Sequence, residues 1–115
     1  MVGVAVSAAE KLAEDDIDVE VLDLRSVAPI DWVTVDESVR RTRRLVVVHE
    51  AVVTGGLGAE LVAGVHATAV EALISPAGRV GAPWAPVPAS PFLECLYAPD
   101  TDDVIAAVLK TLDER

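Results

Sequence analysis

The sequence predicts an α/β domain in three layers, with helices on both faces of a mostly parallel sheet. The run Leu45–Val48 is apolar without alternation, which is typical of a parallel strand that is covered on both faces. His49 and Glu50 follow it, and a glycine loop at 55–58 then opens a segment with helical periodicity. Strand, turn and helix in this order are the unit from which parallel sheets are built.

Length and composition suit a single domain spanning residues 1–115. The chain is 52% hydrophobic but only 3% aromatic, so we expect an aliphatic core in which helices pack closely on the sheet. The formal net charge of −10 argues against nucleic acid, because binding a polyanion needs clustered lysine and arginine. It also disfavours anionic membrane surfaces.

Several features indicate a cytoplasmic protein without a membrane span. Glu50, Glu60 and Glu71 interrupt the longest apolar region, so no transmembrane helix is expected. No basic residue precedes the first apolar stretch, which argues against a signal peptide. The single Cys95 cannot form an internal disulfide and fits a reducing compartment. We expect it to be a small buried side chain.

The first half of the chain predicts a helix, a strand and a second helix. Apolar residues recur at helical spacing over 2–14, and the alternation of 19–24 is strand-like. Asp31 is a good N-cap for a helix over 32–42. Its far end carries Arg40, Arg41, Arg43 and Arg44. This cluster is interpreted as a solvated helix end, with an anion or partner patch as the alternative.

The second half predicts a long helix, a short strand, an extended arm and a last helix. The helix runs from the glycine loop to near Ser75, because Pro76 cannot continue it. Residues 79–81 form a short strand, and four prolines between 83 and 91 predict an extended arm that wraps a surface. Thr101 or Asp100 caps the last helix.

The candidate site lies where the apolar strand meets the glycine loop. An interface or anion site here would use His49, Glu50, Gly55, Gly56 and Gly58, because free N–H groups converge at a helix start. Adjacent strand residues point to opposite faces, so a histidine fixed by hydrogen bonds is favoured over an acid–base pair. Cys95 and His66 do not form a metal-binding pattern. We assign no catalytic, cofactor-binding or metal-ligating residue.

Three blocks of the sequence resemble one known family. They are IDVEVLDLRSVAPID, RRLVVVHEAVVTGGLGAEL and PVPASPFLECLYAPDTDDVIAAVLKTL, and together they cover nearly the whole chain. In this order they resemble the C-terminal, transketolase C-terminal-like domain of the beta subunit of thiamine-dependent 2-oxo acid dehydrogenases. The family's motifs fall on Leu24, Arg25, Pro29, Asp31, His49, Glu50, Gly55, Gly56, Gly58, Pro86, Pro88, Leu93, Glu94 and Pro99.

The resemblance implies a role in assembly and docking. Such enzymes are oxidoreductases that decarboxylate pyruvate or branched-chain 2-oxo acids within a multienzyme complex, and thiamine diphosphate and magnesium belong to the intact enzyme. The implied partners are the alpha subunit, a second beta subunit and the dihydrolipoyl acyltransferase core, and the isolated chain is expected to be inactive. The alternatives are another thiamine-dependent, transketolase-like enzyme and a free-standing anion-binding module.

The sequence also departs from the family. Relatives have glycine at the position of Asp16, and glycine and aspartate where this chain has Ala82 and Trp84. They also carry a pyrimidine-binding domain and two early strands, one of which lies between 19–24 and 45–48. We expect the sheet to lack these strands and to expose two apolar edges. The edges then pair directly, receive a strand from another chain, or leave the domain loosely packed.

Overall fold

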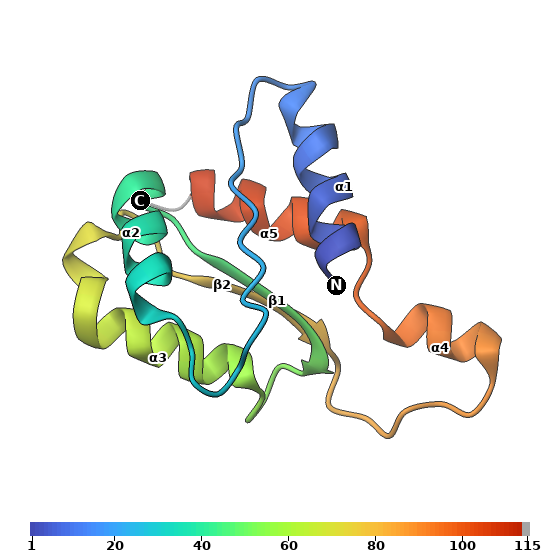
Figure 1. Ribbon diagram of the computed structural model, residues 1–115. Coiled ribbons are helices and arrows are strands. Elements are labelled where there is room, and N and C mark those ends of the chain that lie inside the picture. Colours follow the sequence, from blue (N-terminus) through green and yellow to red (C-terminus); the bar gives the residue numbers. More distant parts are fainter. Residues whose placement is uncertain (114–115) are drawn as a thin grey trace.

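The computed structural model describes residues 1–113 and contains an α/β arrangement around a small parallel sheet (Figure 1). The elements in chain order are α1 Val2–Ala13, α2 Trp32–Thr42, β1 Val46–Val52, α3 Leu57–Ala69, the 3-10 turn η1 Val70–Ala72, β2 Gly78–Ala82, α4 Pro91–Tyr97 and α5 Thr101–Asp113.

The sheet described here consists of β1 and β2, which pair in parallel. Val46 lies opposite Gly78 and Val48 opposite Val80, and the ladder is irregular between Val48 and Val52. The apolar run predicts β1 correctly, but the strand is longer than that run. His49 and Glu50 therefore lie inside the strand rather than beyond its end.

Two apolar clusters cover the two faces of the sheet. On one face, α2 and α3 contribute a buried cluster made of Val35, Val39, Val65 and Ala69. On the other face, Ala8 of α1 and Val104 of α5 pack against Val80 of β2. The three-layer prediction is confirmed, with α1 and α5 on one side and α2 and α3 on the other (Figure 1).

The strand expected over 19–24 is wrong. Residues 17–25 form an unpaired coil that connects α1 to α2 (Figure 1). Residues 18–23 take part in no backbone-to-backbone hydrogen bond with any described residue. The physical reason is that a strand requires a ladder partner, and a cavity separates this segment from the free edge of β1.

The helix ends follow capping chemistry. Asp31 caps α2 as predicted: its carboxylate accepts hydrogen bonds from the Thr34 N–H at 3.1 Å and the Thr34 hydroxyl at 2.7 Å. At α5 the cap is Asp100, whose Oδ1 accepts from the N–H groups of Asp102 at 2.9 Å and Asp103 at 3.0 Å. Two carboxylate caps thus fix the starts of two helices.

The end of α3 differs from the prediction, and the turn after α1 contains a residue with a left-handed conformation. The α-helical part of α3 ends at Ala69 rather than near Ser75, and η1 provides the last turn. After α1, Asp16 adopts a left-handed φ of 60°. Glycine is the residue that adopts this conformation without steric cost.

A helix that the sequence analysis does not predict follows the proline-rich residues of the arm. Residues 83–90 are irregular, but α4 follows them, with Ser90 as its N-cap and Pro91 in its first turn. The Tyr97 hydroxyl donates a 2.9 Å hydrogen bond to the Ala85 carbonyl and ties α4 to the arm.

Among residues 1–113, no helix is long and apolar enough to cross a membrane.

Candidate functional site

His49 lies against the glycine loop and the start of α3. A methyl group on Gly58 would lie 2.5 Å from His49 Nε2 and 2.7 Å from its Cδ2. A methyl group on Gly56 would lie 2.9 Å from His49 Cε1, and one on Gly81 would lie 3.0 Å from the same atom. The imidazole therefore occupies the volume that side chains at these three positions would need.

The loop also needs glycine for backbone reasons. Gly55 has a φ of +72°, a conformation that other residues adopt only with strain. A Cβ at Gly56 would lie 2.4 Å from the Val52 carbonyl oxygen. The turn between β1 and α3 is thus tight, and the glycines have a structural reason that requires no ligand.

The environment of His49 is apolar and lacks hydrogen-bond partners. Both Nδ1 and Nε2 are buried, and neither has a partner among the described residues. The expectation that hydrogen bonds fix this histidine is therefore wrong, and packing against glycine holds the ring instead. Glu50, the next residue along β1, is exposed. The strand alternation does not bring the two side chains together.

The helix start beside His49 carries its own negative charge. Glu60 lies in the first turn of α3, where its carboxylate interacts favourably with the positive end of the helix dipole. An additional anion would have to share this region with that carboxylate and with the imidazole. The geometry describes a closely packed strand–helix junction.

The arginines at the end of α2 divide into paired and unpaired groups. Arg40 contacts Glu71 at 2.6 Å, and this hydrogen bond lowers the pKa of the Glu71 carboxyl. Arg41 forms an ion pair with Glu20. Arg44 differs from both, because it is half-buried and its Nη1 has no hydrogen-bond partner among the described residues. The solvated-end interpretation suits Arg40 and Arg41 but not Arg44.

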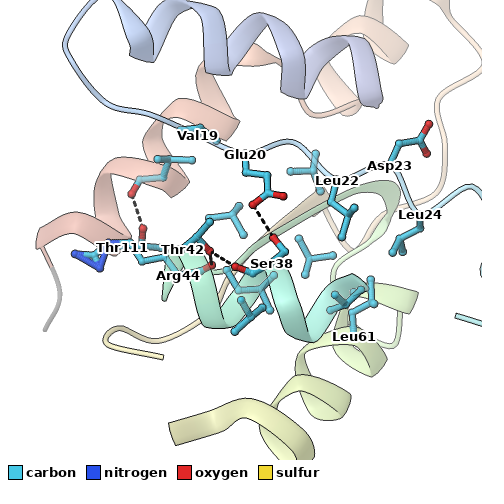
Figure 2. A pocket seen from close by; sticks show the side chains of 18 of the residues that line it. Val19, Glu20, Leu22, Asp23, Leu24, Ser38, Thr42, Arg44, Leu61 and Thr111 are labelled. Carbon is cyan, nitrogen blue, oxygen red and sulfur yellow. Dashed lines mark hydrogen bonds between the residues drawn. The ribbon is translucent and has the colours of Figure 1, made fainter. Parts of the chain in front are cut away.

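A cavity of about 540 Å³ lies beside β1, and we call it the edge cavity. All residues of the coil at 17–25 except Val21 line one side, and residues 44–49 line the opposite side. Side chains of α2 and α3 form a third wall, and residues of α1 and α5 a fourth. Figure 2 shows Leu22 and Leu24 of the coil together with Leu61 of α3 around this space.

The arm and α4 expose a group of large apolar side chains, which we call the arm surface. It comprises Trp84, Val87, Phe92, Leu93 and Leu96, of which Trp84 is 76% exposed and Phe92 74% exposed. No residue of α4 is buried. Cys95 lies on the same helix and is also exposed, so the expectation of a small buried cysteine is wrong.

Sequence reasoning missed this surface although one signal was present. Serine followed by proline marks the start of many helices, and Ser90–Pro91 has that pattern. The four prolines before and at this point favoured an extended path instead.

In the described part of the chain, no three histidine, cysteine, aspartate or glutamate side chains come together in a way that could hold a metal ion.

Comparison with known proteins gives this fold a class. Residues 1–104 match the model of the family described as Transketolase, C-terminal domain. The match covers most of the chain. The chain therefore belongs to the transketolase C-terminal domain family.

Individual relatives come from larger subunits. The chain is 42% identical to the pyruvate dehydrogenase E1 component subunit beta-1, mitochondrial, of Arabidopsis thaliana, over 93% of this chain and 30% of that protein. It is 43% identical to the acetoin:2,6-dichlorophenolindophenol oxidoreductase subunit beta of Cupriavidus necator, over 97% of this chain and 33% of the relative. For the pyruvate dehydrogenase E1 component subunit beta of Rickettsia felis the identity is 41%, over 95% and 33%. The chain spans about a third of the length of these relatives.

Proposed function

We propose that this domain is the C-terminal part of the beta subunit of a thiamine-dependent 2-oxo acid dehydrogenase or a closely related oxidoreductase, and that it serves assembly and docking. The relatives are named as beta subunits of pyruvate dehydrogenase E1 and of acetoin oxidoreductase. Both names support a beta-subunit origin. The substrate of the whole enzyme, whether pyruvate, a branched-chain 2-oxo acid or acetoin, is decided outside these residues.

The arm surface carries the assembly role. Contiguous exposed apolar side chains on a soluble domain mark contact sites with other proteins. Phe92 and Leu96, which is 72% exposed, lie on α4, and Trp84 lies on the arm that leads to it. Aromatic side chains of this kind are common anchors at the centres of interfaces. We place the main subunit contact here.

A second contact is proposed at the strand–loop junction formed by His49, Glu50, Gly55, Gly56 and Gly58. Glu50 and Gly55 are exposed on the surface of this junction, while His49 supports the junction from inside. The carboxyl ends of parallel strands are common places for ligand and partner contacts in α/β folds. This junction would orient the loop that meets a neighbouring subunit.

Thiamine diphosphate and magnesium do not fit the described residues. A diphosphate needs several free donors and a metal-binding carboxylate set, whereas the helix start of α3 is filled by His49 and carries Glu60. In our proposal the intact enzyme holds the cofactor outside this domain. A free-standing anion-binding module is not favoured for the same reason.

The proposed partners are an alpha subunit, a second beta subunit and the dihydrolipoyl acyltransferase core of the complex. The proposed location is the cytoplasm, as for a bacterial enzyme, although the Arabidopsis relative is named as mitochondrial. The acidic net charge of −10 supports protein partners rather than nucleic acid.

A chimera tests the assembly role. The matching C-terminal third of the Rickettsia felis beta subunit is replaced by this chain, and the product is expressed with the Rickettsia alpha subunit. We expect an alpha–beta complex of the same mass as the parent by light scattering. Substituting serine for Phe92 and Leu96 should weaken that complex, whereas Val33→Ser, at an equally exposed position on α2, should not.

Two results would contradict the proposal. A folded chimera that does not bind the alpha subunit would contradict the assignment to a beta subunit. A complex that is unchanged by both arm substitutions would show that the contact does not involve α4.

Calorimetry of this chain with magnesium and thiamine diphosphate provides a separate check. We expect no saturable heat, and micromolar binding would show that the domain does more than assemble.

A further inference from the structure

The arm surface belongs to a segment that packs little on the rest of the domain. No residue of α4 is buried, and α4 makes no extensive contact with any other helix or strand within residues 1–113. Figure 1 shows the arm and α4 projecting beyond the end of β2 before the chain returns to α5. A segment with few buried apolar contacts opens at a low free-energy cost. Contacts within the segment must therefore define its shape.

Both ends of this segment are fixed to the domain. At the first end, Ala82 accepts a 3.1 Å hydrogen bond from the Val53 N–H. At the second end, Asp100 caps α5 and donates its own N–H to the Asp103 carboxylate at 3.0 Å. Residues 83–99 thus form a loop that is anchored at its ends and not held by the sheet in its middle.

One side chain closes this loop. The Tyr97 hydroxyl donates its 2.9 Å hydrogen bond to the carbonyl of Ala85, which lies 12 residues earlier. Within the described chain, this is the only hydrogen bond made by a side chain of residues 83–98. Tyr97 is also the one residue of α4 that is half-buried, whereas the other residues of the helix are exposed. The arm and α4 are therefore joined at this point.

The prolines make a single hydrogen bond more effective. Pro86, Pro88 and Pro91 lie between the two joined residues, and the ring of each proline fixes its own φ. A chain with fewer accessible conformations loses less entropy when its ends are brought together. The loop between Ala85 and Tyr97 is thus stiff before it is closed.

The closure fixes two exposed apolar side chains relative to each other. Trp84 precedes Ala85 and is 76% exposed, while Leu96 precedes Tyr97 and is 72% exposed. Trp84, Leu96 and Tyr97 all line one groove of about 490 Å³ beside the end of β2. A binding surface that is ordered in advance loses less conformational entropy when a partner binds.

From these features we infer that Tyr97 is a positioning residue for the arm surface. Its hydroxyl holds the arm and α4 in one arrangement, so that Trp84 and Leu96 meet a neighbouring subunit together. The identity of that subunit rests on the proposed function, whereas the link between Tyr97 and Ala85 does not. A direct contact between the Tyr97 hydroxyl and the partner is the competing explanation.

Tyr97→Phe separates these explanations in the free chain, because it removes the hydroxyl and keeps the ring. NMR relaxation of the 115-residue chain gives the order parameters of the α4 amides. We expect them to fall from about 0.85, typical of a rigid backbone, to below about 0.6 in the variant. The amide of Val65, in the buried cluster of α3, should keep its value, and the midpoint of thermal unfolding should not change.

The matched control deletes another hydroxyl of the surface. The Thr68 hydroxyl donates a 2.8 Å hydrogen bond to Asp36 between α2 and α3, away from the arm. Thr68→Val should leave the order parameters of α4 unchanged. The general effect of losing one exposed hydrogen bond is thereby separated from the effect at Tyr97.

The chimera with the Rickettsia felis beta subunit tests the consequence for binding. We expect Tyr97→Phe to weaken its affinity for the alpha subunit about tenfold, the equivalent of one well-placed hydrogen bond. Thr68→Val should leave the affinity unchanged. A parent chimera that does not bind the alpha subunit would contradict the proposed function, and the order parameters of the free chain would still decide whether Tyr97 holds α4.

Four results would overturn the inference. The first is an α4 that stays rigid in Tyr97→Phe with unchanged affinity. The second is a rigid α4 with weakened binding, which would show that the hydroxyl contacts the partner directly. The third is a flexible α4 with unchanged affinity, which would separate the arrangement of the arm from binding. The fourth is a lower midpoint of thermal unfolding, which would show that Tyr97 supports the whole domain.

Discussion

At the scale of single residues, His49 is held in place by close packing rather than by hydrogen bonds. Its ring nitrogens have no partners among the described residues, and a buried polar group in that state costs about 1–3 kcal/mol. The ring nevertheless has a defined place because Gly56 and Gly58 leave room for it. Close packing of this kind ties the end of β1 to the start of α3.

Gly58→Ala tests this contact. A methyl group at this position would lie 2.5 Å from His49 Nε2, so the ring or the helix must shift. We expect a loss of about 1–3 kcal/mol in unfolding free energy, although alanine is the better helix former. In a His49→Ala background the same substitution should cost little. Urea titrations of the four proteins in this cycle measure the coupling, and equal costs in both backgrounds would show that the ring is no obstacle.

Asp16 is a strained residue whose replacement should help. It lies in the turn after α1 with a φ of 60°, which an aspartate adopts at a modest cost and a glycine at none. Asp16→Gly should therefore stabilise the domain by up to about 1 kcal/mol. Glu14→Gly is the matched control, since Glu14 has a right-handed φ of −64° and should lose stability. Thermal unfolding checks both, and a destabilised Asp16→Gly would mean that its side chain matters more than its backbone.

At the scale of elements, Leu61 tests which face of α3 is buried. The recurrence of Leu57, Leu61 and Val65 places it on the inner face, and it is 7% exposed. Leu61→Ala should cost about 2–5 kcal/mol, as expected for a truncated core leucine. Leu96→Ala, on the exposed face of α4, should stay within about 0.5 kcal/mol. Denaturant midpoints of the two variants would coincide if the face were wrongly assigned.

The cap of α2 predicts a pH dependence. The hydrogen bond from the Thr34 hydroxyl, followed by that from the Thr34 N–H, lowers the pKa of Asp31 below its ordinary 3.8. A carboxyl whose folded pKa is depressed stabilises the fold above its unfolded pKa, and this contribution disappears as the pH falls through the folded value.

Asp31→Asn separates the charge from the cap geometry. The variant should be less stable than the parent at neutral pH, and the difference should shrink as the pH falls below about 4. Unfolding titrations at a series of pH values measure this difference. A constant gap between about pH 7 and about pH 2 would show that the charge of Asp31 contributes nothing.

The same elements show what a sequence can predict. Helical periodicity and capping residues are local, so α1, α2, α3 and α5 follow from the chain itself. A strand depends on its neighbours, and the alternating segment 19–24 remains coil because no ladder partner lies beside it. Helix α4 was obscured by the prolines before it. The candidate junction at His49 was found, but its packing role depends on a contact with Gly58 that spacing alone does not reveal.

At the scale of the whole molecule, the fold places two helical layers on a sheet whose described part has two strands. The apolar clusters on the two faces are separate, and the strands hold them together. Parallel strands normally lie inside a sheet with partners on both edges. Here β1 has one partner and one free edge, so the amides on its two edges should differ in their protection from hydrogen exchange.

Hydrogen exchange of the free chain measures that difference within one strand. The ladder phase directs the amides of Val47 and His49 toward β2 and those of Val46 and Val48 toward the edge cavity. The first pair should exchange only when β1 and β2 separate, whereas the second pair needs only water in the cavity. We expect Val46 and Val48 to exchange at least about tenfold faster than Val47 and His49. Because all four amides belong to one strand, fraying of the strand would affect both pairs. Equal protection of all four would show that the second edge of β1 is covered, and the asymmetry argued from the ladder would then be absent.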